Sequence, residues 1–220
     1  MRVAAVTGLA AEARIARRAG LAAAASGGDA ARTRAVIARL IADGATALVS
    51  FGICGGLDPA LRPGCLLLPE AVRDAAGTRW AADRAWHARI AAALAARGIA
   101  VRHGDMLGAD AIVASPERKA VLRRESGAIA VDLESHHVAR AAVESGLPFL
   151  VLRAVADPAE RALPPAALIE LDAYGRPALA AVLLSLARHP AQLPALLRVA
   201  IDTRRALRAL GRVAVALAAR

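Results

Sequence analysis

The chain alternates short, continuously apolar runs with longer segments whose apolar residues recur at helical spacing. The clearest apolar runs cover residues 1–7, 46–50, 128–131 and 149–155. Strands that are apolar at every residue are buried on both faces, which is typical of a parallel sheet covered by helices on its two sides. The alternation therefore predicts a single α/β domain, in which a central mixed and mostly parallel sheet lies between two helical layers.

Glycine, proline and capping residues set the bounds of the predicted elements. Asp29 can cap a helix that ends before Gly44, and Ser115-Pro116 has the form of a helix start. Predicted helices cover residues 10–19, 30–42, 84–96 and 135–144, another begins at 115, and further strands lie at 65–68, around 72 and at 99–107. Beyond residue 164 the chain is helical in period, with breaks near Gly175, Pro190 and Pro194.

Length and composition bound the class of protein. A chain of 220 residues with 57 % hydrophobic residues can build one domain with a sizeable core. No segment has the form of a secretory signal or reaches the roughly 18 apolar residues of a membrane span, so we expect a cytoplasmic protein. Cys54 and Cys65 are too few for a disulfide framework and form no CxxC pair, so no metal is predicted.

Positive charge gathers at the C-terminal end. The net charge is +10, and residues 188–220 contribute +6 of it through seven arginines and one aspartate. At helical spacing, one arc of this segment holds Arg198, Arg205, Arg208 and Arg212, and the opposite arc holds Leu196, Val199, Leu207, Leu210 and Leu217. Such helices lie on anionic membrane surfaces, whereas nucleic-acid binding adds aromatic stacking or a reading module. We expect a membrane partner and no nucleic acid; a helix packed on its own domain is the alternative.

Carboxylates and a glycine-rich segment follow the predicted strands. Glu12 comes after the first, Gly52-Ile53-Cys54-Gly55-Gly56 after the second, Asp132 and Glu134 after a later one and Asp157 after the last. The carboxyl ends of parallel strands share one edge of the sheet, where such sheets bind ligands. Taken one at a time, these residues are also ordinary helix caps, helix-start acids or tight turns. Together they indicate a site that acts on a polar substrate.

Two motifs carry a family resemblance. Val131-Asp132-Leu133-Glu134-Ser135 is similar to the "VxMEx" motif, and Leu152-Arg153-Ala154-Val155-Ala156-Asp157 to the "VRAISD" motif, of the purine nucleoside phosphorylase and nucleosidase superfamily. Residues 8–12, 51–57, 63–65 and 110–113 resemble its opening loop, glycine-rich loop, "kxGD" turn and adenine-contacting segment. The resemblance implies a nucleoside phosphorylase-like, three-layer αβα fold, with residues 1–187 as the catalytic domain and 188–220 as a basic amphipathic helical extension of it.

The resemblance also implies roles in breaking an N-ribosidic bond. Asp157 would protonate the departing purine at N7, Glu134 would accept both hydroxyl protons of the ribose diol, and Glu12 would lie near the attacking water. Contacts to the substrate would come from Gly52, Ile53, Gly55, Ile112, Val113, Asp132 and Leu133. Protonation neutralises the leaving base, and an anion stabilises the cationic sugar that remains.

The nucleophile stays open between water and phosphate. Phosphorylases of the superfamily place an arginine and a hydroxyl group around the glycine-rich loop, where this chain has Ser50 and Ile53. Ser26, Gly27 and Gly28 precede a predicted helix and could hold phosphate through backbone N–H groups, or form a plain loop and cap. No cofactor is expected, with inorganic phosphate as an alternative co-substrate.

A narrower resemblance bears on the substrate. "VTGLAAEARIA", "FGICGGLDPALRPG", "VDLESHHVARAA" and "HPAQLPALLR" resemble the hopanoid-associated phosphorylase branch. That branch is implied to release adenine from adenosylhopane, leaving ribosylhopane or phosphoribosylhopane, and a lipid-bearing nucleoside would explain a basic end that lies on the inner membrane face. His136 and His137 would line a widened sugar-side pocket or be ordinary helix histidines.

Two other functions stay open. One is a 5'-methylthioadenosine/S-adenosylhomocysteine nucleosidase, and the other, without catalysis, is a nucleoside-binding, membrane-associated protein. The family resemblance also implies a homo-oligomer.

Overall fold

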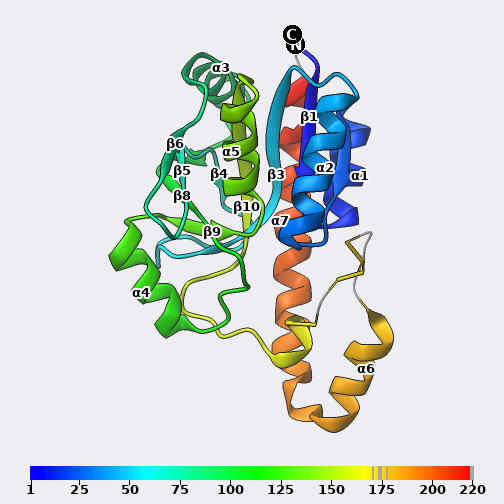
Figure 1. Ribbon diagram of the computed structural model, residues 1–220. Helices are drawn as coiled ribbons and strands as arrows, with labels where there is room; N and C mark the ends of the chain where they lie inside the picture. Colours follow the sequence, from blue (N-terminus) through cyan, green and yellow to red (C-terminus); the bar gives the residue numbers. More distant parts are fainter. Residues whose placement is uncertain (170, 173–174, 177, 219–220) are drawn as a thin grey trace.

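A mixed sheet forms the middle of the molecule (Figure 1). The structure, a computed structural model, describes residues 1–169, 171–172, 175–176 and 178–218. Its strands are β1 (Val3–Thr7), β2 (Ala22–Ala25), β3 (Ala47–Gly56), β4 (Leu66–Leu67), β5 (Ala71–Arg73), β6 (Arg79–Ala81), β7 (Val101–Arg102), β8 (Asp105–Gly108), β9 (Ala130–Asp132) and β10 (Phe149–Asp157). Within this described part of the chain, six of the nine strand pairs are parallel, which confirms the predicted sheet type.

Strand β3 joins the two halves of the sheet. Its first part pairs with β1 on one side and with β10 on the other, both in parallel. Its last residues, Gly55 and Gly56, pair antiparallel with β9. The resulting order is β6-β5-β8-β9-β3-β10-β4-β7, and β1 and β2 branch from β3. The ends of β3, β9 and β10 therefore lie close together.

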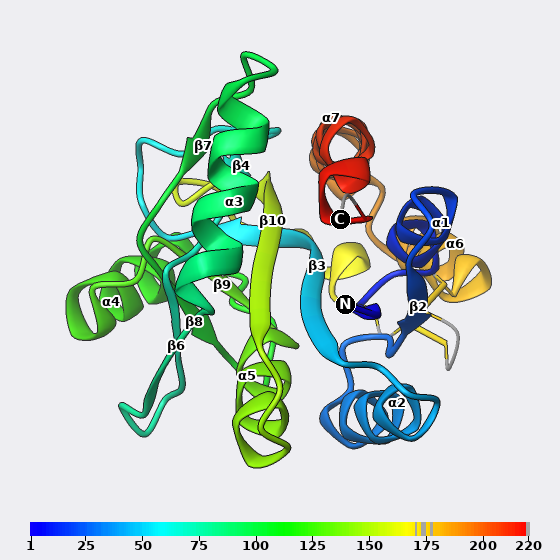
Figure 2. The same cartoon turned by 90° about the horizontal axis from the view of Figure 1, so that it is seen from above.

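Helices cover the sheet on both sides, which confirms the three-layer prediction. One side carries α1 (Ala10–Arg18), α3 (Arg84–Ala95) and the second half of α7 (Leu193–Ala218), and the other carries α2 (Ala30–Ala42) and α5 (Ser135–Glu144). Each layer has its own cluster of buried apolar side chains against the sheet. Figure 2 shows α7 and the pair of α2 and α5 on opposite sides of β3.

Several local predictions are confirmed and others are wrong. Asp29 caps α2 by accepting a hydrogen bond from the N–H of Arg32 at 2.7 Å, and Ser115 caps α4 (Pro116–Ser126). The glycine-rich segment is not a loop, because β3 continues through it to Gly56. The predicted strand at 99–107 is two strands, β7 and β8, because the chain turns at Gly104 with φ near 129°.

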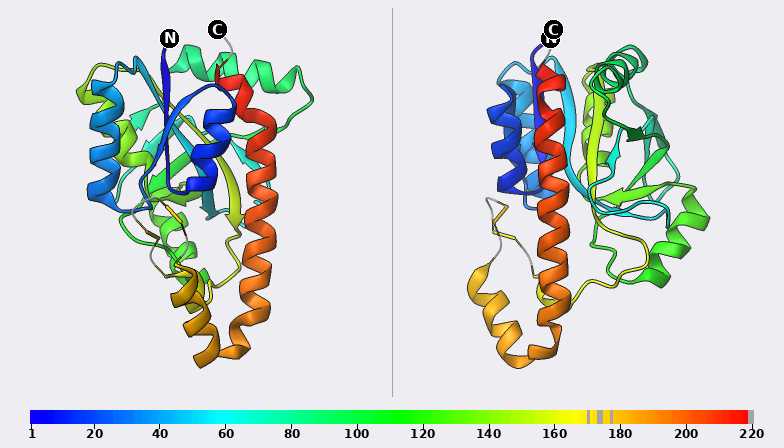
Figure 3. Two further views of the ribbon diagram at one scale, coloured as in Figure 1. Left: turned by 90° about the vertical axis from the view of Figure 1, so that its right-hand side faces the viewer. Right: turned by 180° about the vertical axis from the view of Figure 1, so that it is seen from behind.

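The C-terminal helices form a hairpin that projects from the domain (Figure 3). It consists of α6 (Leu179–Arg188), a short turn at Pro190–Gln192 and the first half of α7; the short helix η1 (Pro165–Ala167) precedes it. Pro194 does not break the helix as predicted, because it lies in the first turn of α7, where its missing N–H costs no hydrogen bond.

The two halves of α7 have different surroundings. Ala206, Leu210, Val213 and Leu217 are buried against the sheet, so this half packs on its own domain, as the alternative interpretation of the segment predicted. The predicted arginine arc is exposed along the helix. No residue of α6 is buried, and none of the helices within the described ranges is long and apolar enough to cross a membrane. Arg220 lies outside the described residues.

Candidate active site

Arg153 is the centre of a buried cluster of charges. It lies in β10 opposite Gly52 of β3 and is 1 % exposed. Its Nη2 lies 2.7 Å from Asp132 Oδ2 and 3.0 Å from Glu134 Oε2, and it donates to Ser50 Oγ at 2.6 Å. No role for Arg153 was predicted from the sequence. A charged residue inside an apolar strand is the signal that could have identified it, because arginine is almost never fully buried unless it is paired.

Glu12 reaches the same cluster from α1. One of its carboxylate oxygens accepts a hydrogen bond from Leu9 N–H and the other from Ile53 N–H, each at 2.7 Å. A Cβ atom on Gly52 would stand 2.7 Å from side-chain atoms of both Glu12 and Arg153. Only glycine leaves room for these two side chains against β3. The structure thus brings together Glu12, Gly52 and Ile53, as the predicted site requires.

Glu134 and Asp132 have different surroundings within the cluster. Glu134 is buried at the start of α5, and its Oε1 faces Gly8 and Gly28. Burial raises the pKa of Glu134 to about 7, although Arg153 opposes this effect; burial likewise raises the pKa of Glu12. The oxygens of Asp132 accept hydrogen bonds from the N–H and hydroxyl of Ser135 and face Arg153. Asp132 therefore holds Arg153 and the start of α5, instead of presenting free oxygens for the predicted substrate contact.

Asp157 lies on the same strand as Arg153, roughly 13 Å further along β10. It pairs with Gly55 of β3, which also contacts the side chain of Val131. Lys119 of α4, which the sequence analysis did not single out, places its Nζ 2.5 Å from Asp157 Oδ2. The other carboxylate oxygen, Oδ1, is buried and has no hydrogen-bond partner among the described residues. Burial raises the pKa of Asp157, and Lys119 opposes the rise.

The remaining predicted contacts line up between these two ends. Leu133 lies against Gly28, on the side of Glu134. Val113 packs with Val131 and Leu57, on the side of Asp157. Ile112 is 47 % exposed, so its side chain is open to a ligand or to solvent. Leu133 thus belongs to the Glu134 end of the site, and Gly55, which pairs with Asp157, to the other end.

The backbone of Ser26 and Gly27 does not form the predicted phosphate site. The N–H and the hydroxyl of Ser26 both donate to the carbonyl of Thr7, and the N–H of Gly27 donates to the carbonyl of Gly8. Donors that are engaged in this way cannot also bind an anion. The alternative interpretation, a loop and cap, describes these two residues, and Gly28 lies against Leu133.

Asp172 and Gly175 lie beside Gly27 and Gly8, next to the Glu134 end of the site. The carbonyl of Gly175 accepts a hydrogen bond from Ala10 N–H at 3.0 Å, and the carbonyl of Asp172 lies against Gly27. Gly175 packs so closely on Gly8 that a Cβ atom there would stand 2.4 Å from the Gly8 carbonyl oxygen. Asp172 and Gly175, which precede α6 in the sequence, therefore lie against Gly27 and Gly8, and Gly8 in turn faces Glu134.

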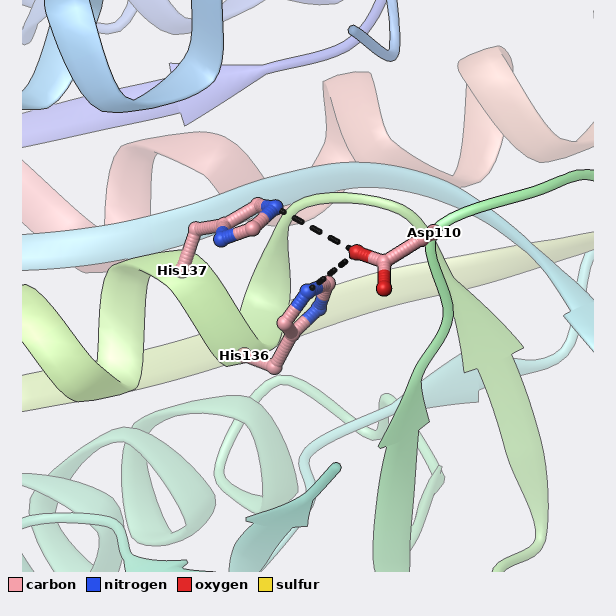
Figure 4. Close-up of side chains that lie close together, drawn as sticks. All are labelled: Asp110, His136 and His137. Atoms are coloured by element: carbon pink, nitrogen blue, oxygen red, sulfur yellow. Dashed lines mark hydrogen bonds and ion pairs between the residues drawn. The ribbon is translucent and has the colours of Figure 1, made fainter. Parts of the chain in front are cut away.

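Asp110, at the start of the predicted adenine-contacting segment, lies close to two histidines of α5, and the three side chains have the chemistry of metal ligands (Figure 4). Asp110 Oδ1 lies 3.2 Å from His136 Nε2 and 3.8 Å from His137 Nε2, and Asp110 is largely exposed while both histidines are buried. Burial and His136 lower the pKa of His137 to about 4, and Arg34 and Arg140 add to this effect. His137 is therefore neutral at pH 7, and both histidines lie beside Asp110, the first residue of the predicted adenine-contacting segment. Surrounding arginines oppose a further cation, and the absence of a metal stays a prediction.

Comparison with known proteins bears on the family and the fold of the chain. A family model described as the phosphorylase superfamily matches residues 26–188. The sequence has no match among curated proteins. Futalosine hydrolase of Helicobacter pylori has a similar structure, with a TM-score of 0.74, 14 % identity and coverage of 98 % of this chain and 96 % of that one.

Two nucleosidase structures are also similar. The 5'-methylthioadenosine/S-adenosylhomocysteine nucleosidase of Neisseria meningitidis, in complex with methylthio-immucillin-A, has a TM-score of 0.67 and 19 % identity, with 98 % and 99 % of the two chains covered. The Helicobacter pylori enzyme of that name, with butyl-thio-DADMe-Immucillin-A, has a TM-score of 0.66 and 16 % identity, with 97 % of each chain covered. These likenesses concern the fold. Because the family model spans well over half of its length, the chain belongs to the phosphorylase superfamily.

Proposed function

We propose that the protein hydrolyses the N-ribosidic bond of adenosylhopane, releasing adenine and leaving ribosylhopane. The general reaction rests on the family and on the arrangement of buried carboxylates. The choice of a lipid-bearing substrate rests on one observation: Gly175, which packs on Gly8 beside Glu134, comes shortly before α6 in the sequence, and α6 begins a projecting hairpin with exposed apolar side chains.

Asp157 supplies the proton that the departing base needs. Its buried Oδ1 has no partner among the described residues, and burial raises its pKa, which shifts the carboxyl group towards the protonated form that an acid catalyst needs. Transfer of this proton to N7 neutralises the base as the electrons of the glycosidic bond move onto it. At the Glu134 end of the site, the Glu134 carboxylate accepts hydrogen bonds from the two ribose hydroxyls. Arg153 keeps this carboxylate in place and opposes its protonation.

Water, rather than phosphate, suits the charge of the site. The guanidinium of Arg153 is already engaged by Asp132, Glu134 and Ser50, and Glu12 lies nearby. A phosphate dianion would have to displace these partners to pair with Arg153, and the neighbouring carboxylates would repel it. The raised pKa of Glu12 makes that carboxylate a better base for a water molecule.

The hairpin combines apolar and basic side chains. Its exposed large apolar residues are Leu179, Leu183 and Leu184 on α6 and Leu193, Leu197 and Ile201 on α7. Arg188, Arg198 and Arg204 are exposed on the same two helices. Apolar side chains can enter the acyl boundary of a bilayer while arginines stay near anionic headgroups. A groove of about 370 Å³ between η1 and α6, lined by Pro165, Ile169 and Leu184 among others, offers space for part of an apolar substituent.

Two alternatives predict different behaviour. A 5'-methylthioadenosine/S-adenosylhomocysteine nucleosidase would use the same carboxylates, and the fold likeness favours it, but it gives the hairpin no part in turnover. A second copy of the chain could also cover the exposed leucines, which would make the hairpin the interface of a homo-oligomer. We propose the membrane as the occupant because arginines flank the apolar residues.

The decisive assay measures adenine release from adenosylhopane in anionic vesicles and from methylthioadenosine in solution, each with and without phosphate. We expect phosphate-independent turnover of adenosylhopane and a product with the mass of ribosylhopane. Rapid cleavage of methylthioadenosine with no turnover of adenosylhopane would overturn the substrate, and a strict requirement for phosphate would overturn hydrolysis.

Variants of the hairpin show whether its exposed leucines contact a membrane or a second copy of the chain. The double variant Leu183→Asp/Leu197→Asp should lose at least tenfold in adenosylhopane turnover and keep its activity on methylthioadenosine. Val143→Asp, at an exposed apolar residue of α5, is the matched control and should keep both activities. A double variant that changes its mass in solution but keeps its activity on vesicles would identify the hairpin as an interface between copies.

A further inference from the structure

Lys119 is an exception in the composition of this chain. It is the only lysine among 29 lysine and arginine residues, and its side chain is completely buried. Burying an ammonium group without partners is very costly, so a lysine in this position needs a set of acceptors that fits it. A chain that otherwise uses arginine must have a physical reason for lysine here.

The acceptors around Lys119 match the three donors of an ammonium group. Nζ lies 2.5 Å from Asp157 Oδ2, 2.9 Å from the carbonyl of Pro158 and 3.0 Å from the carbonyl of Arg161. All three donors leave from one nitrogen, whereas a guanidinium spreads its donors over a planar fork and needs more space. Lysine therefore fits this closed position and arginine does not.

Lys119 engages only one of the two carboxylate oxygens of Asp157. The other, Oδ1, is buried and has no partner among the described side and main chains. We propose that Lys119 is a positioning residue for the reaction: it holds Oδ2 and thereby leaves Oδ1 as the atom that meets the departing base. This inference rests on the proposed function, in which Asp157 is the acid.

The charges around Asp157 leave Lys119 as its main partner. Arg161, after β10, and Asp202, on α7, pair with each other, so their effects on Asp157 oppose one another. Cys54 on β3 also faces this region, and burial raises the pKa of its thiol, so it is neutral. Lys119 thus limits the rise in the pKa of Asp157 that burial causes, which keeps the acid strong enough to protonate a base.

Kinetic variants test the proposal. Lys119→Met and Lys119→Gln should lower kcat by at least tenfold with KM within threefold of the wild-type value. Without the Lys119 ammonium group, the pH at which kcat falls on the basic side should rise by about one unit or more. Lys119→Arg keeps the charge but not the fit, so kcat should fall while that pH stays unchanged. In an Asp157→Asn background, Lys119→Met should cause no further loss, because the residue acts through Asp157.

A measurement on the wild-type protein avoids any question of folding. Because Lys119 is the only lysine, labelling with ¹⁵N-lysine gives one side-chain signal in an NMR spectrum. We expect saturating adenine to shift the Nζ signal, and the shift to be lost in Asp157→Asn. A signal that adenine does not change would overturn the role of Lys119.

The acid role of Asp157 and the positioning role of Lys119 can be refuted separately. If Asp157→Asn is as active as the wild type, the proposed acid is wrong. If Asp157→Asn is inactive but Lys119→Met and Lys119→Gln keep the wild-type kcat and pH profile, the positioning role alone is wrong. Thermal unfolding of each variant shows whether a loss of activity comes with loss of the fold.

Discussion

Arg153 Nη2 lies 3.0 Å from Glu134 Oε2, and both side chains are almost completely buried. The pair joins β10 to the start of α5, Asp132 of β9 pairs with the same guanidinium, and its charge also acts on Glu12 of α1. One cation therefore lies among carboxylates from three elements of the fold and pairs with two of them. The stability of the domain and the shape of the site depend on the same residue.

Arg153→Met should destabilise the protein by about 3–5 kcal/mol at pH 7, because it leaves buried carboxylates without their cation. Arg39→Met is the matched control: Arg39 lies on the surface of α2, 3.7 Å from an exposed Asp43. Its effect should stay within about 0.5 kcal/mol. Urea unfolding of both variants checks this, and equal effects would contradict the role of Arg153.

The stability of the fold should fall as pH rises, through Glu134. Burial raises its pKa in the folded protein from 4.5 to about 7, so the folded state binds the proton more tightly than the unfolded state. The resulting stabilisation is complete below about pH 4.5 and is lost as pH rises through 7, a difference of about 3 kcal/mol. Glu134→Gln cannot titrate. Between pH 4.5 and 8, the unfolding free energy of the wild type should therefore fall relative to that of Glu134→Gln. Parallel curves for the two proteins would refute the raised pKa of Glu134.

Gly52→Ala should reduce adenine release at least tenfold, because its Cβ would stand 2.7 Å from atoms of Glu12 and Arg153 and displace them. The forced shift should also cost about 1–3 kcal/mol of stability. Gly211→Ala tests the same change in α7, where a Cβ meets nothing within 4 Å. That control should keep full activity and gain about 0.5–1 kcal/mol. Steady-state rates and thermal unfolding of the pair distinguish a steric effect from a general intolerance of alanine.

Much of the fold follows from local signals in the sequence. The apolar strands, the cap at Asp29 and the helix start at Ser115 act over a few residues, so they can be identified without tertiary information. The break at Gly104 could not be predicted from periodicity, because it depends on β7 and β8 pairing with different neighbours. The two halves of α7 look alike in sequence, and only packing against the sheet separates them.

The site was harder to predict than the fold. The order of the motifs identified Glu12, Asp132, Glu134 and Asp157 as candidates, but their partners come from distant parts of the chain. Arg153 and Lys119 act through contacts made across strands and from α4, which no spacing rule reveals. The engagement of Ser26 by the carbonyl of Thr7 likewise depends on the pairing of β1 with β2.

The hairpin should bind anionic vesicles. Leu183→Asp/Leu197→Asp removes two exposed leucines and adds two negative charges, so co-sedimentation with vesicles that contain anionic lipid should fall at least tenfold. Salt should weaken binding of the wild-type protein, because it screens the arginines. Val143→Asp adds the same kind of charge elsewhere and should bind normally. Equal binding by all three proteins would place any membrane contact elsewhere.

The most direct test of the account is the rate of adenine release by the wild type, Asp157→Asn and Glu134→Gln. If Asp157 protonates the base while Glu134 holds the sugar, Asp157→Asn should lower kcat by about 10²–10⁴-fold with the fold intact. Glu134→Gln should lower kcat/KM by at least tenfold, because the amide cannot accept both ribose hydroxyls as a carboxylate does. Wild-type rates in both variants, or no adenine release by the wild type from any adenine nucleoside, would contradict the account.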